Sequence, residues 1–144
     1  MPVIDIPDLN LWLALIDGDH THHVRARRYW EEEAASHLGF CRVTMLGLLR
    51  LLTNARVMHG APFTAAEAWE AYRAFAALPE VCFVEDSVVA ENRFELWSRV
   101  PGFPADRWTD AWIAAIASSV DARAVSFDRD FRMFGDLDLL HLRP

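Results

Sequence analysis

The sequence predicts an α/β fold, an α/β/α sandwich around a mainly parallel central sheet. Short apolar runs alternate with stretches whose apolar residues recur every three or four positions, the pattern of strands joined by helical crossovers. The chain of 144 residues carries no internal repeat or flexible linker. It is long enough to bury one core and offers no boundary that would divide it. We therefore expect a single domain over residues 1–144.

Helix-capping and helix-breaking residues set the expected elements of the N-terminal half. Pro7 ends the first apolar run, and Asp8 is placed to cap the helix that follows. Gly39 breaks the next amphipathic stretch, and Thr44 can cap a leucine-rich helix. We expect strands at residues 3–6 and 40–43, and helices at residues 9–16, 24–35 and from Thr44 to Leu52.

The C-terminal half continues the alternation. Thr64 with Glu67 forms a capping-box signature, and Pro79 ends the helix that it starts. Asp86 or Ser87 caps a further helix, which is followed by a strongly apolar one. We expect helices at residues 64–78, 87–97 and 106–119, and strands at residues 81–84, 122–127 and, at the edge of the sheet, 137–142.

Charge narrows the functions that the chain can serve. Its 14 basic residues are all arginine and face 21 acidic residues, which leaves a net charge of −7. This balance excludes a protein that holds nucleic acid through broad positive charge. A nucleic-acid enzyme of this composition needs a local arginine surface and a divalent metal to offset its own acids.

The cysteines and the N-terminus indicate a reducing, cytoplasmic setting. Cys41 and Cys82 fall in expected strands and are typical of small core residues, not of a disulfide scaffold. The opening residues MPVIDIPDLN carry no basic leader, and no apolar run approaches membrane-spanning length. We expect a cytoplasmic protein.

Three aspartates are placed where an α/β sheet gathers ligands. Asp8 follows the first expected strand, Asp128 follows the strand at residues 122–127, and Asp110 lies early in the apolar helix. Ligands of open α/β sheets bind beyond the carboxyl ends of the strands. Carboxylate oxygens at that edge suit Mg²⁺ or Mn²⁺, which can activate a bound water against a phosphodiester.

A purely structural interpretation stands beside this one. An aspartate at a strand–helix junction is most often an N-cap, which accounts for Asp8 or Asp128 taken singly. Asp110 is harder to explain in that way, because Thr109 or Asp106 could cap its helix. A carboxylate among apolar neighbours is costly to bury without a partner or an ion.

Short motifs in one order run through nearly the whole chain, at residues 8–10, 22–30, 44–54, 109–111 and 126–131. They read, in turn, as an Asp-Leu-Asn start before an apolar helix, a His-His segment ahead of a tryptophan, TMLGLLRLLTN, Thr-Asp-Ala, and SFDRDF. Each is weak alone. In this order the chain resembles the PIN-domain ribonucleases, specifically the VapC-type toxins of bacterial type II toxin–antitoxin systems.

The resemblance implies a PIN-like sandwich and a metal-dependent endoribonuclease that hydrolyses RNA phosphodiester bonds with Mg²⁺ or Mn²⁺. It also implies a homodimer and a small VapB-like antitoxin that inhibits the enzyme. Carried over by position, the catalytic metal ligands are Asp8, Asp110 and Asp128. The residues expected to orient these acids or to contact the RNA are Asn10, Thr44, Arg50, Thr109, Ser126 and Asp130.

The chain departs from the family pattern at Met45. Many relatives place a glutamate directly after the threonine that matches Thr44, as a further metal-site acid. A thioether is a poor ligand for Mg²⁺, so the change leaves open weaker metal binding or a substitute ligand such as Asp130. It also keeps an alternative function open: a catalytically weak or inactive PIN-fold module that binds a protein or RNA through the same acidic groove.

Two further clusters favour ordinary structural roles. Arg25, Arg27 and Arg28 are expected to pair with the glutamates at residues 31–33 on a solvated helix face. The histidines of residues 20–23 lack a second ligand pair at zinc-site spacing. We expect them at an exposed helix entry.

Overall fold

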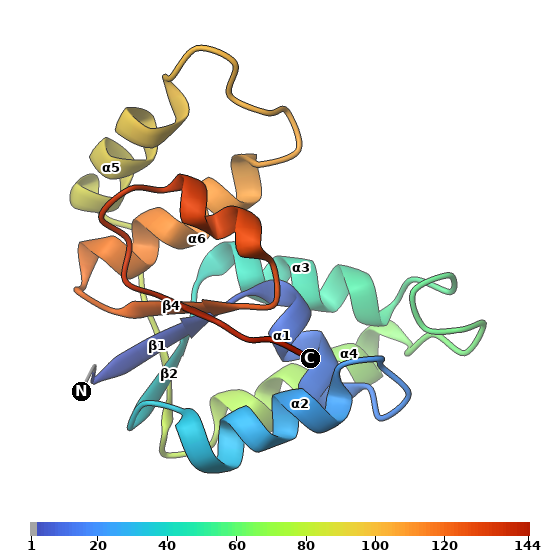
Figure 1. Ribbon diagram of the computed structural model, residues 1–144. Helices are drawn as coiled ribbons and strands as arrows, with labels where there is room; N and C mark the ends of the chain where they lie inside the picture. The colour runs from blue at the N-terminus through green and yellow to red at the C-terminus, as the bar shows by residue number, and fades with distance from the viewer. Residues whose placement is uncertain (1–2) are drawn as a thin grey trace.

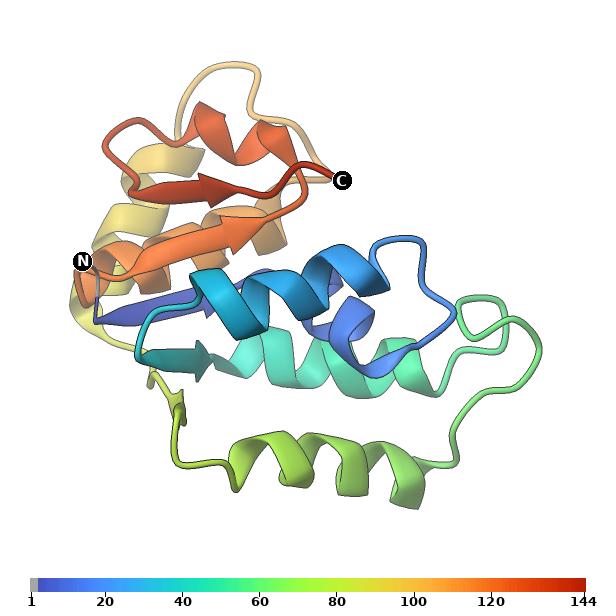
Figure 2. The same ribbon diagram turned by 60° about the horizontal axis from the view of Figure 1, so that its bottom comes forward.

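Five parallel strands form the sheet at the centre of the protein. The computed structural model describes residues 3–144. The strands are β1 (Ile4–Pro7), β2 (His37–Phe40), β3 (Val81–Phe83), β4 (Arg123–Ser126) and β5 (Leu139–His141). They run in the order β3-β2-β1-β4-β5, and every neighbouring pair is parallel. Figure 2 shows β4 and β5 side by side and pointing the same way.

Helices cover both faces of this sheet. They are α1 (Leu9–Ile16), α2 (His23–Arg28), α3 (Arg42–Leu52), α4 (Ala65–Ala76), α5 (Val88–Ser98) and α6 (Trp108–Ser119). Figure 1 shows α1, α2 and α4 on one side of the sheet and α5 and α6 on the other. Buried residues form two clusters accordingly, one around Trp12 and Phe40 and one around Ile6 and Ile113. The expected α/β/α sandwich is confirmed, with a sheet that is parallel throughout.

The register of the two central strands places the first acids. Pro7 at the end of β1 pairs with Val125 in β4. The backbone N–H of Asp8 donates to the carbonyl of Val125 at 2.8 Å, one step beyond the ladder. Because both strands end at the same edge, the residues that follow them emerge next to each other.

The second strand and the helix after it lie earlier than predicted. The strand occupies residues 37–40 instead of 40–43, and α3 begins at Arg42. Gly39 belongs to this strand and therefore breaks no helix. A Cβ at this position would lie 2.8 Å from Ile6 Cδ1. Thr44 is not the N-cap either. Its hydroxyl accepts from the N–H of Cys41, which is the cap residue.

The remaining elements follow the prediction closely. The helix expected at residues 24–35 is α2 continued by a π-helical turn over Tyr29–Glu33. Thr64 and Glu67 form the expected capping box, and Ser87, rather than Asp86, caps α5. The apolar helix starts at Trp108 instead of residue 106, and the edge strand is confirmed as β5.

A buried ion pair joins the first strand to its neighbours. Asp5 is fully buried and accepts from Arg123 Nε and Nη2, both at 2.9 Å. It also accepts from the Tyr29 hydroxyl at 2.6 Å and the Ala35 N–H at 3.0 Å. A buried carboxylate with these partners is tightly compensated, but removing it leaves a guanidinium stranded. Sequence inspection did not single out this pair.

Asp5→Ala should therefore lower the free energy of unfolding by about 3–5 kcal/mol, the usual cost of breaking a buried pair. Chemical denaturation followed by tryptophan fluorescence measures the change. Asp136→Ala, at an exposed position, should change stability by less than about 0.5 kcal/mol. Equal effects of the two substitutions would show that the Asp5 pair stabilises nothing.

Among residues 3–144, no helix is long and apolar enough to cross a membrane.

Candidate active site

Asp8 stands at the carboxyl end of β1 and is almost fully buried. Its Oδ1 accepts from the Leu9 N–H at 2.6 Å, which makes it the N-cap of α1 as the structural interpretation expected. Its Oδ2 accepts from the Ser126 hydroxyl at 2.8 Å. Capping therefore uses one oxygen only. The other is oriented toward the end of β4 by a buried hydroxyl.

Ser126 connects Asp8 to Asp128. Its Oγ donates to Asp8 and accepts from the N–H of Asp128 at 2.9 Å. Asp128 in turn starts a 3-10 turn, η2 (Arg129–Met133), where its Oδ1 accepts from the N–H of Asp130 at 2.9 Å. Hydrogen bonds through Ser126 thus connect the turn after β4 to the start of α1.

Asp110 joins this group through Arg107, which precedes α6. Arg107 Nη1 donates to Asp110 Oδ2 at 2.8 Å and to Asp128 Oδ2 at 2.6 Å. Its Nη2 donates to Asp130 Oδ2, and its Nε lies 3.9 Å from an oxygen of Asp106. One guanidinium therefore holds together acids from two segments of the chain.

Burial and mutual repulsion set the protonation of the three acids. Burial raises the pKa of Asp8 to about 6, and the charges of Asp110 and Asp128 push in the same direction. Burial also raises the pKa of Asp110, although Arg107 opposes it. Burial would raise the pKa of Asp128 too. Hydrogen bonds from the Asp130 N–H and from Arg107 outweigh that effect and lower it. Asp8 and Asp110 therefore both resist ionisation, whereas Asp128 ionises more readily than a free aspartate.

Other residues predicted for the site divide into near and distant ones. Asn10 lines a hollow together with Asp8 and Asp128, and Thr109 is exposed in the first turn of α6. Thr44 lies at the start of α3, where its hydroxyl bonds to Cys41 and to none of the acids. Arg50 is exposed in the last turn of that helix.

Met45, at the position of the family glutamate, is buried in the core cluster around Trp12 and Phe40. Its sulfur accepts from Arg42 Nη1 at 3.3 Å. No carboxylate replaces the missing glutamate at this position.

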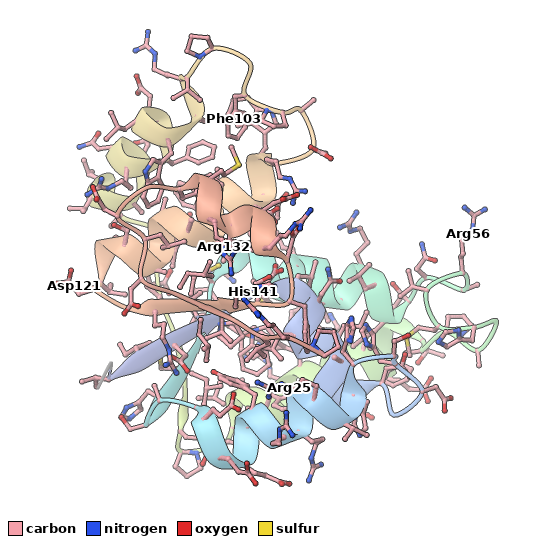
Figure 3. The ribbon with its side chains drawn as sticks, in the orientation of Figure 1. Arg25, Arg56, Phe103, Asp121, Arg132 and His141 are labelled. Atoms are coloured by element: carbon pink, nitrogen blue, oxygen red, sulfur yellow. The ribbon has the colours of Figure 1, made fainter. Side chains whose placement is uncertain are left out.

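The hollow beside Asp8 has a volume of about 520 Å³ and an unexpected lining of histidines. His22 stacks on Phe127 with ring centroids 4.4 Å apart. His20 Nδ1 accepts from the His22 N–H at 3.0 Å, which leaves its Nε2 as the donor. His141 lies beside Arg132 in Figure 3 and contacts the Phe127 carbonyl at 3.1 Å. The expected helix entry is confirmed, because His22 is the N-cap of α2, but His20 and His22 are half-buried and line this hollow.

The arginines of α2 follow the prediction in part, since Arg27 is exposed as expected but Arg25 is largely buried. Arg27 pairs with Glu31 at 2.9 Å and Arg25 with Glu33 at 3.0 Å. Figure 3 shows Arg56 at the tip of the loop after α3, pointing away from the rest of the molecule. None of these side chains lies among the acids.

Arg107 is the residue that sequence inspection missed. Its position three residues before Asp110, at the start of an apolar helix, was the available signal, since side chains at i and i+3 are helix neighbours. Its link to Asp128 depends on the tertiary fold and leaves no trace in local spacing.

The donor chemistry of the site suits a hard divalent cation, since Asp8, Asp110 and Asp128 offer only carboxylate oxygens. Burial and the charges of Asp110 and Asp128 raise the pKa of Asp8, and a bound cation would oppose both effects. As the side chains stand, however, no three Asp, Glu, His or Cys residues within 3–144 are placed to hold a metal ion together. The carboxylates are arranged around Arg107 instead.

Comparison with known proteins identifies the family. The family model of the PIN domain matches residues 6–137. The chain belongs to the PIN-domain family. Ribonuclease VapC41 of Mycobacterium tuberculosis is 38% identical over 140 residues, covering 92% of this chain and 94% of that protein. Ribonuclease VapC33 of the same species is 32% identical, with 92% and 93% covered. The resemblance to VapC-type PIN domains is thus confirmed.

Solved structures share the architecture of this PIN domain. Mycobacterium tuberculosis VapC20, described as a toxin that cleaves the sarcin–ricin loop, aligns with a TM-score of 0.73 at 20% identity. The alignment covers 97% of this chain and 99% of that one. VapBC-1 of nontypeable Haemophilus influenzae gives 0.71 at 18% identity, with 96% and 97% covered. At these identities the likeness establishes the fold.

The raised pKa of Asp8 predicts how stability of the PIN domain depends on pH. Because the folded-state pKa of about 6 exceeds the ordinary value of 3.8, the folded protein binds this proton more tightly than the unfolded chain. This contribution therefore falls as pH rises from about 4 through 6 and stays lost above.

Asp8→Asn should remove that penalty. In metal-free buffer at pH 7.5 we expect the variant to be more stable than the wild type by about 1–3 kcal/mol, with the gain fading toward pH 4. Denaturation curves across this range measure it. A variant that is less stable at every pH would contradict the raised pKa.

Proposed function

We propose that this PIN domain, taken as one unit over residues 1–144, is a metal-dependent endoribonuclease of the VapC toxin type. The observation that carries the proposal is the gathering of Asp8, Asp110 and Asp128 at one sheet edge. Ser126 links the first and third acids, and Arg107 links the second and third. Kinship to proteins named ribonuclease VapC adds the substrate class.

The three aspartates would hold Mg²⁺ or Mn²⁺, with Asp130 as a further acid at the rim. Such an ion, when bound, activates water and stabilises charge on the phosphodiester. Ser126 fixes the Asp8 carboxylate by hydrogen bonding, the kind of support that orients metal-binding acids. Above its pKa of about 6, Asp8 is a carboxylate and can serve as a ligand.

The hollow beside Asp8 would bind the RNA strand next to the metal site. Arg129 and the donor Nε2 of His20 line it together with Asn10, and these groups suit phosphate and sugar contacts. The stacked pair of His22 and Phe127 offers an aromatic face to an unpaired base.

Met45 supports a second candidate function, a PIN-fold module that binds RNA or a protein without cleaving it. Its buried thioether contributes no acid where many relatives carry glutamate. The two functions differ in one measurable property, since only the enzyme requires a divalent ion for turnover.

Asp8→Asn and Asp128→Asn should each lower the rate of RNA cleavage at least about 100-fold, because the loss of one carboxylate would weaken binding of the ion that would activate the attacking water. Ser126→Ala should lower it by about 10–100-fold, the usual effect of losing a group that orients a ligand. Cleavage of total RNA with Mn²⁺, followed by sequencing of the cut ends, measures these rates and identifies the target.

Asp136→Asn, at an exposed position outside the site, is the matched control and should cleave as the wild type does. EDTA should abolish cleavage. Wild-type protein that binds RNA but never cuts it, at any Mg²⁺ or Mn²⁺ concentration, would favour the second candidate.

The partners that we propose are a VapB-like antitoxin and a second copy of the chain, in the cytoplasm. Solved neighbours from Rickettsia felis and Haemophilus influenzae are described as VapBC assemblies. Cys41 and Cys82 are free thiols, which suits a reducing compartment.

Co-expression with the product of the adjacent open reading frame should give a complex that co-elutes with this chain and suppresses cleavage. Light scattering on the free protein should give twice the mass of one chain. A protein that stays monomeric and uncomplexed in both measurements would contradict these partners.

A further inference from the structure

The guanidinium of Arg107 lies where the acids of the site converge. It is 19% exposed and donates through Nη1 to one oxygen of Asp110 and one of Asp128, and through Nη2 to Asp130. Three hydrogen-bonded carboxylates around one cation form a strong, charge-assisted cluster. Arg107 thus compensates the charge of three carboxylates and not of one.

The same oxygen atoms are the ones that a divalent ion would need. Asp110 Oδ2 and Asp128 Oδ2 both point at Arg107 Nη1, at 2.8 and 2.6 Å. A divalent ion at the 2.0–2.1 Å typical of Mg²⁺ would place a second cation beside the guanidinium on the same oxygens. The two like charges repel, so that they compete for these carboxylates. Within residues 3–144 the acids are not placed to hold a metal ion together, and the guanidinium lies among them instead.

Space for the arginine to leave lies next to it. A hollow of about 550 Å³ is lined by Arg107, Asp130, Pro104 and Met133. Asp130 and Asp106 are 52% and 82% exposed and offer carboxylates at the rim. Arg107 is also the last residue of the connection between α5 and α6. This connection arches away from the sheet (Figure 1). The side chain can therefore turn outward while keeping an acidic partner.

We infer that Arg107 is a built-in counter-ion that competes with the divalent metal for Asp110 and Asp128 and swings out when the metal binds. The inference rests on the proposed function, because it takes these acids as metal ligands. Metal binding therefore requires a threshold concentration of the ion. Below it, Arg107 stays hydrogen-bonded to Asp110 and Asp128 and occupies the site.

Arg107→Gln tests the competition by metal binding, not by activity. Hydrogen bonds to charged groups are stronger than those between neutral groups, and partial exposure weakens them. We therefore expect Mn²⁺ to bind the variant about tenfold more tightly in a calorimetric titration, a change of about 1.4 kcal/mol. Without metal its melting temperature should fall, because the acids repel one another, and Mn²⁺ should restore more stability than in the wild type.

Arg129→Gln is the matched control, since it removes a positive charge lining both hollows without removing a hydrogen bond to these acids. It should tighten Mn²⁺ binding far less. Arg107→Lys keeps the charge but cannot bridge two acids through a planar fork. We expect it to fall between the wild type and Arg107→Gln, and it serves if the glutamine variant fails to fold.

The outcomes separate this inference from the proposed function. Mn²⁺ binding that requires Asp8 but is equal or weaker in Arg107→Gln overturns the inference and leaves the proposed metal site standing. Equal tightening by Arg129→Gln also overturns it, because general electrostatics would then suffice. Mn²⁺ binding that is absent, or unaffected by Asp8→Asn, contradicts the proposed function and the inference together.

Discussion

The structure depends on a cation for the carboxylates gathered at one end of the sheet. Asp8, Asp110, Asp128 and Asp130 meet there in a protein that already carries a net charge of −7. Like charges at close range are destabilising unless a proton or a cation compensates them. Two forms of compensation are visible: Arg107 binds three of the acids, and burial favours the protonated form of Asp8. A divalent ion would replace both.

The fold makes this concentration of charge possible through rigid neighbours. The pairing of β1 with β4 puts Asp8 beside the end of the next strand, and Ser126 locks that relation with hydrogen bonds in both directions. At the other end of β1 the pair of Asp5 and Arg123 is buried and fully partnered. The same strands thus carry the buried pair of Asp5 and Arg123 at one end. At the other end they carry Asp8, whose carboxylate has no cationic partner among the described residues.

Local patterns were enough to predict the alternation of elements, the capping box at Thr64 and the place of Asp8 and Asp128 at strand ends. They failed at residues 39–44. There, Gly39 lies in a strand, where a Cβ would meet the Ile6 side chain at 2.8 Å. The hydroxyl of Thr44 accepts from the N–H of the cap residue Cys41, so that Thr44 is the third residue of the capping box and not the cap itself. Contacts between distant segments were beyond sequence reasoning. The link from Arg107 to Asp128 spans 21 residues, and the stack of His22 on Phe127 joins opposite ends of the chain.

A crystal structure of the Mn²⁺-soaked protein, with anomalous scattering recorded for the metal, tests the central claim most directly. The account predicts one strong peak among the carboxylates of Asp8, Asp110 and Asp128, with the Arg107 guanidinium turned out toward Asp130 and solvent. A map with no peak there, and the guanidinium still bridging its acids at saturating metal, would contradict it.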